Sequence, residues 1–339
     1  MQNSKLRMIV YLAAGVFFFF FWLVWLFPTE ALKSRILTEI ENQTQGRYKF
    51  DVGALDISIF GSVTFKNLKV SEGVGESEKV LLKTPKLKLS FSPFALGSMA
   101  KKPDLNFSLA GSKGSLEGSY RQDGDDLQLQ ANFDRFPLSD LGIISAKTRM
   151  ALSGILDGDI DLKLNKADPN KNAGTIDLDI QNLAINSSQI PLPSAFEGAV
   201  DEALKSQAAG ADNPIKVALN RGPTGAILDL SGVKLSGTKD SGLRAEVKKD
   251  NLEISSLSLK NGDLDLGLSG RVNLVGARAG DYRLALQGGF SATENLRKAL
   301  VFVFFIIEDQ KNPQGQYPLN VTGRLGKPTV RIGTFNLPI

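Results

Sequence analysis

The sequence predicts a mostly β protein, in which one N-terminal transmembrane helix precedes a long antiparallel β-sheet region with two or three short helices. Three observations lead to this prediction. Residues 8–27 carry no charge, apolar and polar residues alternate in many stretches after Arg47, and Gly, Asn and Asp separate many of these stretches. A period of two is typical of strands that bury one face, and such separators are typical of the turns of a meander.

The uncharged run 8–27 is long enough to cross a bilayer, because a helix of about 20 residues spans roughly 30 Å. A cleavable signal peptide is the alternative, but its apolar core would be about 7–15 residues long and would end at small residues. This run ends in Trp-Leu-Phe-Pro. Lys5 and Arg7 precede it and favour a cytoplasmic start. We therefore expect residues 1–7 to be a cytoplasmic tail and residues 8–27 a single-pass anchor.

Three helices are expected after the anchor. Residues 28–46 show apolar residues at helical spacing, which predicts a membrane-proximal helix. A second helix is expected at about 195–209, after the breaker string 191–193. A third is expected at about 292–309, where residues 291–294 read Ser-Ala-Thr-Glu and fit a capping box.

The third helix contains an unusual run, because Leu300–Ile307 is apolar throughout. This run is too short to span a bilayer. As a helix it would be apolar all round and therefore buried, and as a strand it would be buried on both faces. We expect a core segment, and the alternative is an element that touches a membrane or a partner.

Half-buried strands are expected wherever the alternation is regular. They comprise residues 48–52, 55–59, 63–70, 86–91, 105–109, 127–133, 160–164, 176–180, 243–247, 264–268, 282–286 and 330–332. Two architectures fit this pattern. A closed sandwich would bury one face of each of two sheets. A long curved sheet, open along one side, would use the same pattern and present an apolar concave face.

Composition excludes several classes of function. The chain has 40 basic and 36 acidic residues, no cysteine and no histidine. No basic stripe with interleaved aromatic residues is present, so we do not expect nucleic acid as a partner. Without histidine or cysteine the chain has no Ser-His-Asp triad, no thiolate nucleophile and no thiolate- or imidazole-ligated zinc.

Two motifs are candidates for a functional site. The stretches Gly158–Leu164 and Gly262–Leu268 both read Gly-Asp-apolar-Asp-Leu-x-Leu. Carboxylates two residues apart on a strand point the same way and could bind calcium, but we expect them to be the solvent face of half-buried strands. Residues 236–239 have the Ser-x-x-Lys spacing of some acyl enzymes, but they lie in a Gly-rich turn rather than at a helix start. We therefore propose no catalytic, cofactor-binding or metal-binding residue and expect no enzymatic activity.

The layout of the chain resembles that of the AsmA-like superfamily, in which one anchor, a short helix and a strand with a Gly-Arg start follow one another. Here that strand start is Gln45–Phe50, followed by Leu55–Val70. Residues Tyr317–Pro328 are similar to the closing strand pattern of the superfamily. Within this group, the size and the single anchor are most similar to the type II secretion system protein N family.

The resemblance implies that residues 47–339 form a periplasmic, β-rich AsmA-like domain of a bacterial inner-membrane protein. It implies a non-enzymatic accessory component of a type II protein secretion system, with membrane lipids and other secretion-system subunits as partners. The alternative is a lipid-binding or lipid-transfer protein that acts between membranes, with a β groove for acyl chains.

Overall fold

The structure is a computed structural model of the whole chain. It describes residues 33–34, 37–38, 42, 44–58, 61–73, 78–91, 104–148, 150–188, 190–191, 218–222, 225–275 and 279–337. The expected anchor 8–27 and the expected helix 195–209 lie outside these residues. Across the described ranges, no helix combines the length and the apolar character that a membrane crossing requires. Within the expected helix 28–46, residues 33, 34, 37, 38 and 42 are helical.

Most of the described chain is a single antiparallel sheet of 15 strands, which confirms the mostly β prediction. Its first part consists of β1 (Tyr48–Ser58), β2 (Ser62–Glu72), β3 (Lys79–Phe91), β4 (Asp104–Ala110), β5 (Ser115–Asp123), β6 (Asp126–Pro137), β7 (Met150–Asn165) and β8 (Ala173–Ser188). Its second part consists of β12 (Gly242–Lys248), β13 (Asn251–Leu259), β14 (Leu264–Asn273), β15 (Arg283–Ala292), β16 (Tyr317–Arg324), β17 (Lys327–Ile332) and β18 (Phe335–Leu337).

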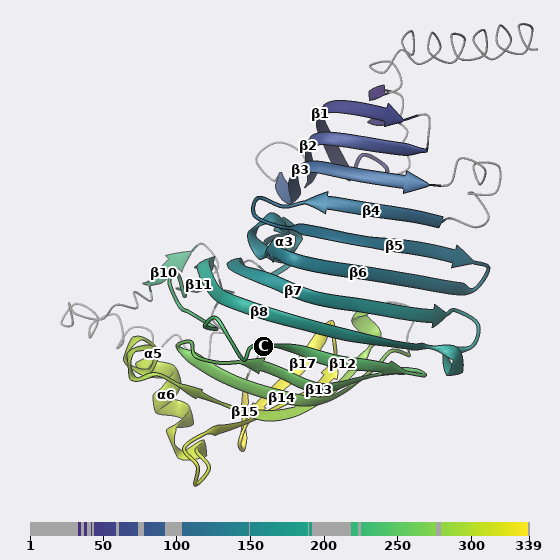
Figure 1. Cartoon of the computed structure of the whole chain (residues 1–339). Helices are drawn as coiled ribbons and strands as arrows, with labels where there is room; N and C mark the ends of the chain where they lie inside the picture. Colours follow the sequence, from purple (N-terminus) through teal and green to yellow (C-terminus); the bar gives the residue numbers. More distant parts are fainter. Residues whose placement is uncertain are drawn as a thin grey trace, which may run out of the picture.

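The strand order follows the chain, so each strand pairs with the strands before and after it. The order is interrupted between β8 and β12, which pair directly although a separate three-stranded sheet lies between them in sequence. That small sheet comprises β9 (Ile190–Pro191), β10 (Ala218–Gly222) and β11 (Gly225–Asp229). Figure 1 shows the strands stacked like rungs from β1 to β8, after which β12–β15 continue the same surface. Except at the β8–β12 pairing, strands that follow one another along the chain pair with each other, so the sheet is built mostly from pairings between neighbours in sequence.

Three short helices lie at one end of the strands: α3 (Gly142–Thr148), α5 (Glu294–Ala299) and α6 (Val301–Ile307). The expected helix 292–309 is confirmed, although it is divided at Leu300 and ends in a 3₁₀ turn, Glu308–Gln310. Its capping residue was predicted wrongly. Thr293, not Ser291, is the N-cap, and its hydroxyl accepts a hydrogen bond from the Leu296 amide at 3.4 Å. Ser291 belongs to β15, where the ladder already pairs it with Asp265.

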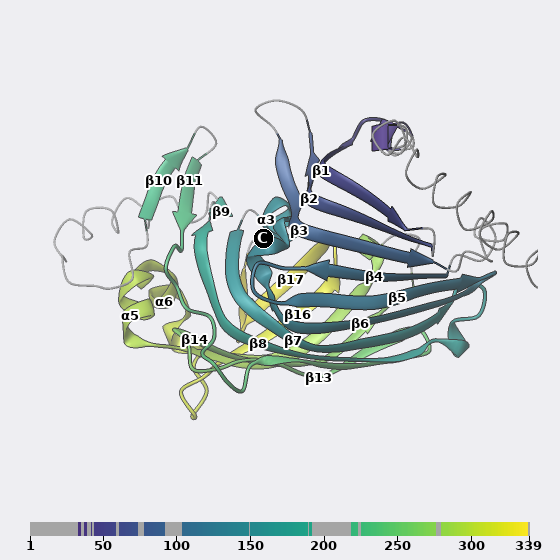
Figure 2. The same cartoon turned by 45° about the horizontal axis from the view of Figure 1, so that its top comes forward.

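The sheet bends into a trough, as Figure 2 shows, with α3 on its concave side. Ile144 of α3 packs against a buried cluster formed by Leu138, Leu156 and Leu183. Leu156 precedes Ile160 on the same face of β7, because residues two apart on a strand point the same way. The apolar face of the sheet is therefore its concave face.

Candidate functional site, an apolar face along the whole sheet

The strand register aligns apolar residues into a row that crosses the whole sheet. Directly paired residues share a face, so the row can be followed from strand to strand. It contains one apolar residue or glycine from each of the 15 strands: Ile57, Val63, Leu89, Phe107, Gly118, Ala131, Ile160, Ile176, Ala245, Ile254, Gly270, Leu286, Val321, Val330 and Leu337.

A second row runs beside the first and is equally complete. It contains Leu55, Phe65, Leu87, Leu109, Leu116, Phe133, Gly158, Leu178, Leu243, Leu257, Leu268, Gly288, Leu319, Ile332 and Phe335. Strands in a sheet lie about 4.8 Å apart, so the two rows extend over roughly 65–70 Å measured along the surface. We call this surface the apolar trough.

The middle of the apolar trough is only partly covered. From β5 to β8 every member of both rows is half-buried, including Leu116, Ile160, Ile176 and Leu178. In a closed sandwich these central positions would be fully buried against a second sheet. The open, curved sheet is therefore correct and the closed sandwich is wrong.

One end of the apolar trough is covered by α5 and α6. Phe304 and Ile307 of α6 are buried, and they pack in one cluster with Tyr317 and Ile332 of the sheet. The Tyr317 ring stacks on Phe290 with ring centroids 5.1 Å apart. The expected core role of the run 300–307 is therefore correct for one side of the helix.

The other side of α6 faces solvent, and Phe305 is 83% exposed. The expectation that a helix apolar all round would be wholly buried is wrong at this residue. The reason is that α6 packs on the end of an open sheet, which covers one side of the helix. The alternative of a surface that contacts a membrane or a partner stays open for Phe305.

A charged cluster ties α5 and α6 to the sheet. Glu308 accepts hydrogen bonds from Arg297 (3.0 Å to each carboxylate oxygen), from Lys311 and from the Tyr317 hydroxyl (2.8 Å). The hydrogen bond from Lys311, and next the one from Tyr317, lower the pKa of Glu308. Burial raises the pKa of Tyr317, so its hydroxyl stays a proton donor to this carboxylate. The cluster holds α5 and α6 against β16.

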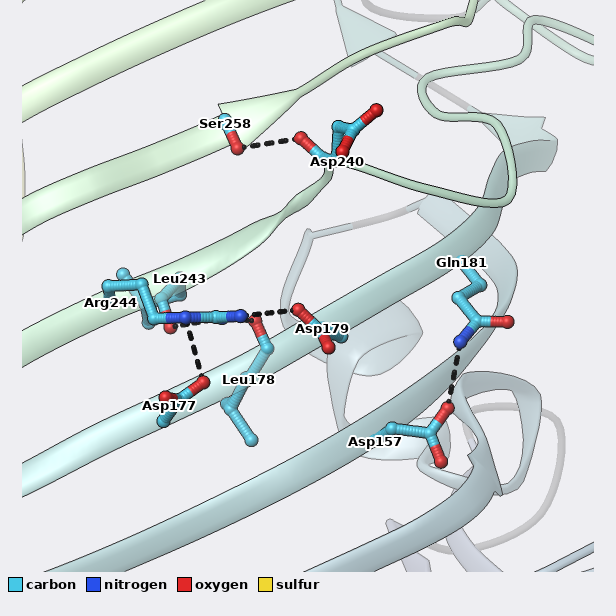
Figure 3. A network of polar contacts seen from close by, with 9 residues as sticks. All are labelled: Asp157, Asp177, Leu178, Asp179, Gln181, Asp240, Leu243, Arg244 and Ser258. Carbon is cyan, nitrogen blue, oxygen red and sulfur yellow. Dashed lines mark hydrogen bonds and ion pairs between the residues drawn. The ribbon is translucent and has the colours of Figure 1, made fainter.

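The opposite face of the sheet is polar, and Figure 3 shows its best-connected group. Arg244 on β12 bonds to Asp177 (2.8 Å) and Asp179 on β8, and also to the Leu178 carbonyl (2.7 Å). On the neighbouring pair of strands, Gln181 donates to Asp157 at 3.0 Å. Arg244 thus spans the β8–β12 pairing, where the strand order is interrupted.

A hollow of about 950 Å³ lies beside Arg244 on this polar face. Its acidic residues have basic partners. Asp177 pairs with Arg244, and Lys248 bonds to Glu246 (2.7 Å) and Glu253 (3.3 Å). The hydrogen bond to Glu246, followed by the one to Glu253, raises the pKa of Lys248. Neutralised ion pairs of this kind are typical of a solvated surface.

The two stretches that read Gly-Asp-apolar-Asp-Leu-x-Leu differ in the surroundings of their aspartates. Asp159 and Asp161 lie on the polar face of β7 and accept hydrogen bonds from Asn132 (2.7 Å) and Gln130 (3.1 Å). Asp263 precedes β14 and accepts from the Lys234 amide at 2.8 Å, while Asp265 accepts from the Asn261 amide. The solvent-face interpretation agrees with Asp159, which is exposed, whereas Asp161 is half-buried and its Oδ1 atom is buried. Within the described ranges, no group of three acidic residues is placed to hold a metal ion.

Ser236 has a structural role. It is 3% exposed, and its hydroxyl accepts a hydrogen bond from the Leu183 amide at 3.0 Å. This bond holds the segment before β12 against the end of β8. The Ser-x-x-Lys spacing of residues 236–239 therefore marks a turn, as the sequence indicated.

Comparison with protein-family models, with curated proteins and with solved structures gives no match to this chain. We therefore infer the function from the geometry of the apolar trough. Sequence patterns identified most of the strands whose apolar residues line it, but not β5, β13 and β18. The alignment of those residues into two complete rows comes from the register, which periodicity within single strands does not specify.

Proposed function

We propose that this protein binds lipids and that the apolar trough holds their acyl chains. One observation carries the proposal: both rows remain apolar across all 15 strands, while their central members are only half-buried. Large exposed apolar surfaces on a protein usually mark an interaction site, because apolar area in water costs about 25 cal/mol per Å². An acyl chain covers such a surface without needing any polar partner.

The length of the apolar trough supports a transfer function. At roughly 65–70 Å it is more than twice the thickness of a bilayer hydrocarbon core, which is about 30 Å. Several lipids could lie along it in sequence. Together with the anchor expected at residues 8–27, this favours a protein that holds lipid between two membranes.

An accessory role in type II secretion is our second proposal. It is supported by the positions of the two resembling motifs. Residues 45–50 lead into β1, the first strand of the sheet, and residues 317–328 span β16 and the start of β17. Secretion genes beside this one would favour this proposal.

Leu266→Asp tests the lipid-binding proposal. Leu266 lies on the apolar face of β14 between Leu259 and Phe290, and Ser269→Asp is the matched control on the polar face of the same strand. A carboxylate in an open trough keeps access to water, so we expect the full-length variant to stay folded, to melt a few degrees lower and to lose copurifying phospholipid. The control should keep its lipid.

Two results would count against lipid binding. Unfolding of Leu266→Asp with an intact control would indicate a closed core, where an unpartnered carboxylate costs several kcal/mol. A folded variant with unchanged lipid content would leave the secretion role as the better proposal.

A further inference from the structure

The polar face of β2 and β3 is strongly basic. The two strands contain six lysines and a single acidic residue, Glu72. Along the sequence the excess of basic residues is not obvious, because apolar residues separate the lysines. The register brings them together, and it places Lys66 opposite Lys86 and Lys69 opposite Lys83.

These lysines lie on the side of the sheet that faces away from the apolar trough. Phe65, Leu68, Leu82 and Leu87, which alternate with them, pack in one apolar cluster on the other side. We call the group Lys66, Lys69, Lys83, Lys86 and Lys88 the lysine face. Like charges directly opposite each other destabilise a pair of strands. A bound anion would reduce the repulsion that remains between these lysines.

Two members of the lysine face form ion pairs, and three have no charge partner among the described residues. Lys66 pairs with Asp56 and Lys69 with Glu78, each at 2.6 Å. In the part of the chain that the structure describes, the ammonium groups of Lys83, Lys86 and Lys88 make no hydrogen bond or ion pair, and all three residues are exposed. They are free to bind an anionic surface.

We propose that the lysine face binds the anionic headgroups of the bilayer in which residues 8–27 are expected to be anchored. β1 is the first strand after the expected anchor and membrane-proximal helix, and β3 lies two strand spacings, or about 10 Å, beyond it. With the β1 edge of the sheet against the headgroups, β3 would lie within about one Debye length (8–10 Å) of them, the range over which charges attract. Each lysine near such a surface strengthens binding roughly fivefold.

Lysine acetylation rates, measured residue by residue with mass spectrometry, test this proposal on the full chain. The chain is placed in nanodiscs of phosphatidylcholine alone, or with about a fifth of phosphatidylglycerol. We expect Lys83, Lys86 and Lys88 to react several-fold more slowly in the anionic discs, and the difference to vanish in high salt. Lys163 on β7 and Lys171 in the turn between β7 and β8 are exposed and far from β1 in the strand order, so they are internal controls.

Equal rates in both kinds of disc would overturn the proposal. Slowing that is independent of lipid charge and rises with protein concentration would indicate a second copy instead. Slowing by an added acidic peptide, with none from anionic lipid, would indicate an acidic protein partner. The lipid content of the apolar trough is measured on the same samples and tests the proposed function separately.

A charge-reversed variant provides an independent check. Lys66 and Lys69 lie on the same face, so we expect them also to react more slowly in anionic discs, although by less because they are ion-paired. Lys83→Glu, Lys86→Glu and Lys88→Glu together should abolish this protection of Lys66 and Lys69. This variant should melt no lower than the native chain, because two like-charge pairs become opposite-charge pairs. Lys163→Glu with Lys171→Glu is the matched control and should leave protection intact. If the reversed variant fails to fold, the three Lys→Gln changes replace it, and persistence of protection in them would contradict the proposal.

Discussion

Phe305 and Ile307 lie two residues apart on α6 and have opposite surroundings. Ile307 is 1% exposed in the cluster beneath the helix, whereas Phe305 is 83% exposed. Ile307→Ala should lower the free energy of unfolding by about 2–5 kcal/mol, because it removes buried methyl groups and leaves a cavity. Phe305→Ala should change it by less than about 0.5 kcal/mol. Urea unfolding compares the two, and equal losses would contradict the observed packing of α6.

Glu308 makes the end of the sheet sensitive to acid. Its pKa in the folded protein is lowered, first by the hydrogen bond from Lys311 and then by that from Tyr317. A lowered pKa means that the stabilisation is present above the ordinary glutamate value of about 4.3 and is lost as pH falls through the folded value. Glu308→Gln should therefore flatten the acid side of the melting temperature against pH. Identical pH curves for the two proteins would show that this cluster adds no stability.

At the scale of single elements, close backbone approach explains why a glycine lies in the middle of β5. A methyl group on Gly118 would collide with the Gln130 carbonyl and lie 2.6 Å from the Phe107 ring. Gly118→Ala should therefore destabilise the sheet by about 1–3 kcal/mol. Gly267 on β14 has open space around the same position, so Gly267→Ala should be neutral or slightly stabilising. Thermal melts of the two variants test this difference, and a neutral Gly118→Ala would contradict the close approach.

The regularity of the apolar pattern within each element decides whether the sequence predicts that element. Within β6, β7 and β8 the sequence predicted residues 127–133, 160–164 and 176–180, because apolar and polar residues alternate there. The remaining parts of these strands, which contain register shifts, were not predicted. β5 was not expected, because Gly118 interrupts the pattern between Leu116 and Tyr120. The helix α3 was also missed, since seven residues are too few to establish a helical period. It forms where packing against β3 and β7 favours it.

At the scale of the whole molecule, the sequence pattern does not distinguish a closed sandwich from an open sheet. Both architectures use a period of two, so each strand carries the same pattern in either. The difference lies in which strands pair and in what register, because a slip of one residue would turn a strand's apolar set to the other face. Two complete rows form only if every pair of neighbouring strands has the register that places apolar residues opposite each other. The candidate site is therefore a property of the register, and the chemistry of its residues alone gave no signal.

Site-specific photo-crosslinking tests most directly whether the apolar trough holds lipid. A photoreactive residue is placed at Leu129, which is half-buried on the apolar face of β6 beside Ala131 of the apolar trough, or at Gln130, its exposed neighbour on the polar face of β6. The full chain is irradiated in its native membranes and analysed by mass spectrometry. Our account predicts a phospholipid adduct at position 129 and little at position 130. No adduct at 129, or equal adducts at both positions, would contradict it.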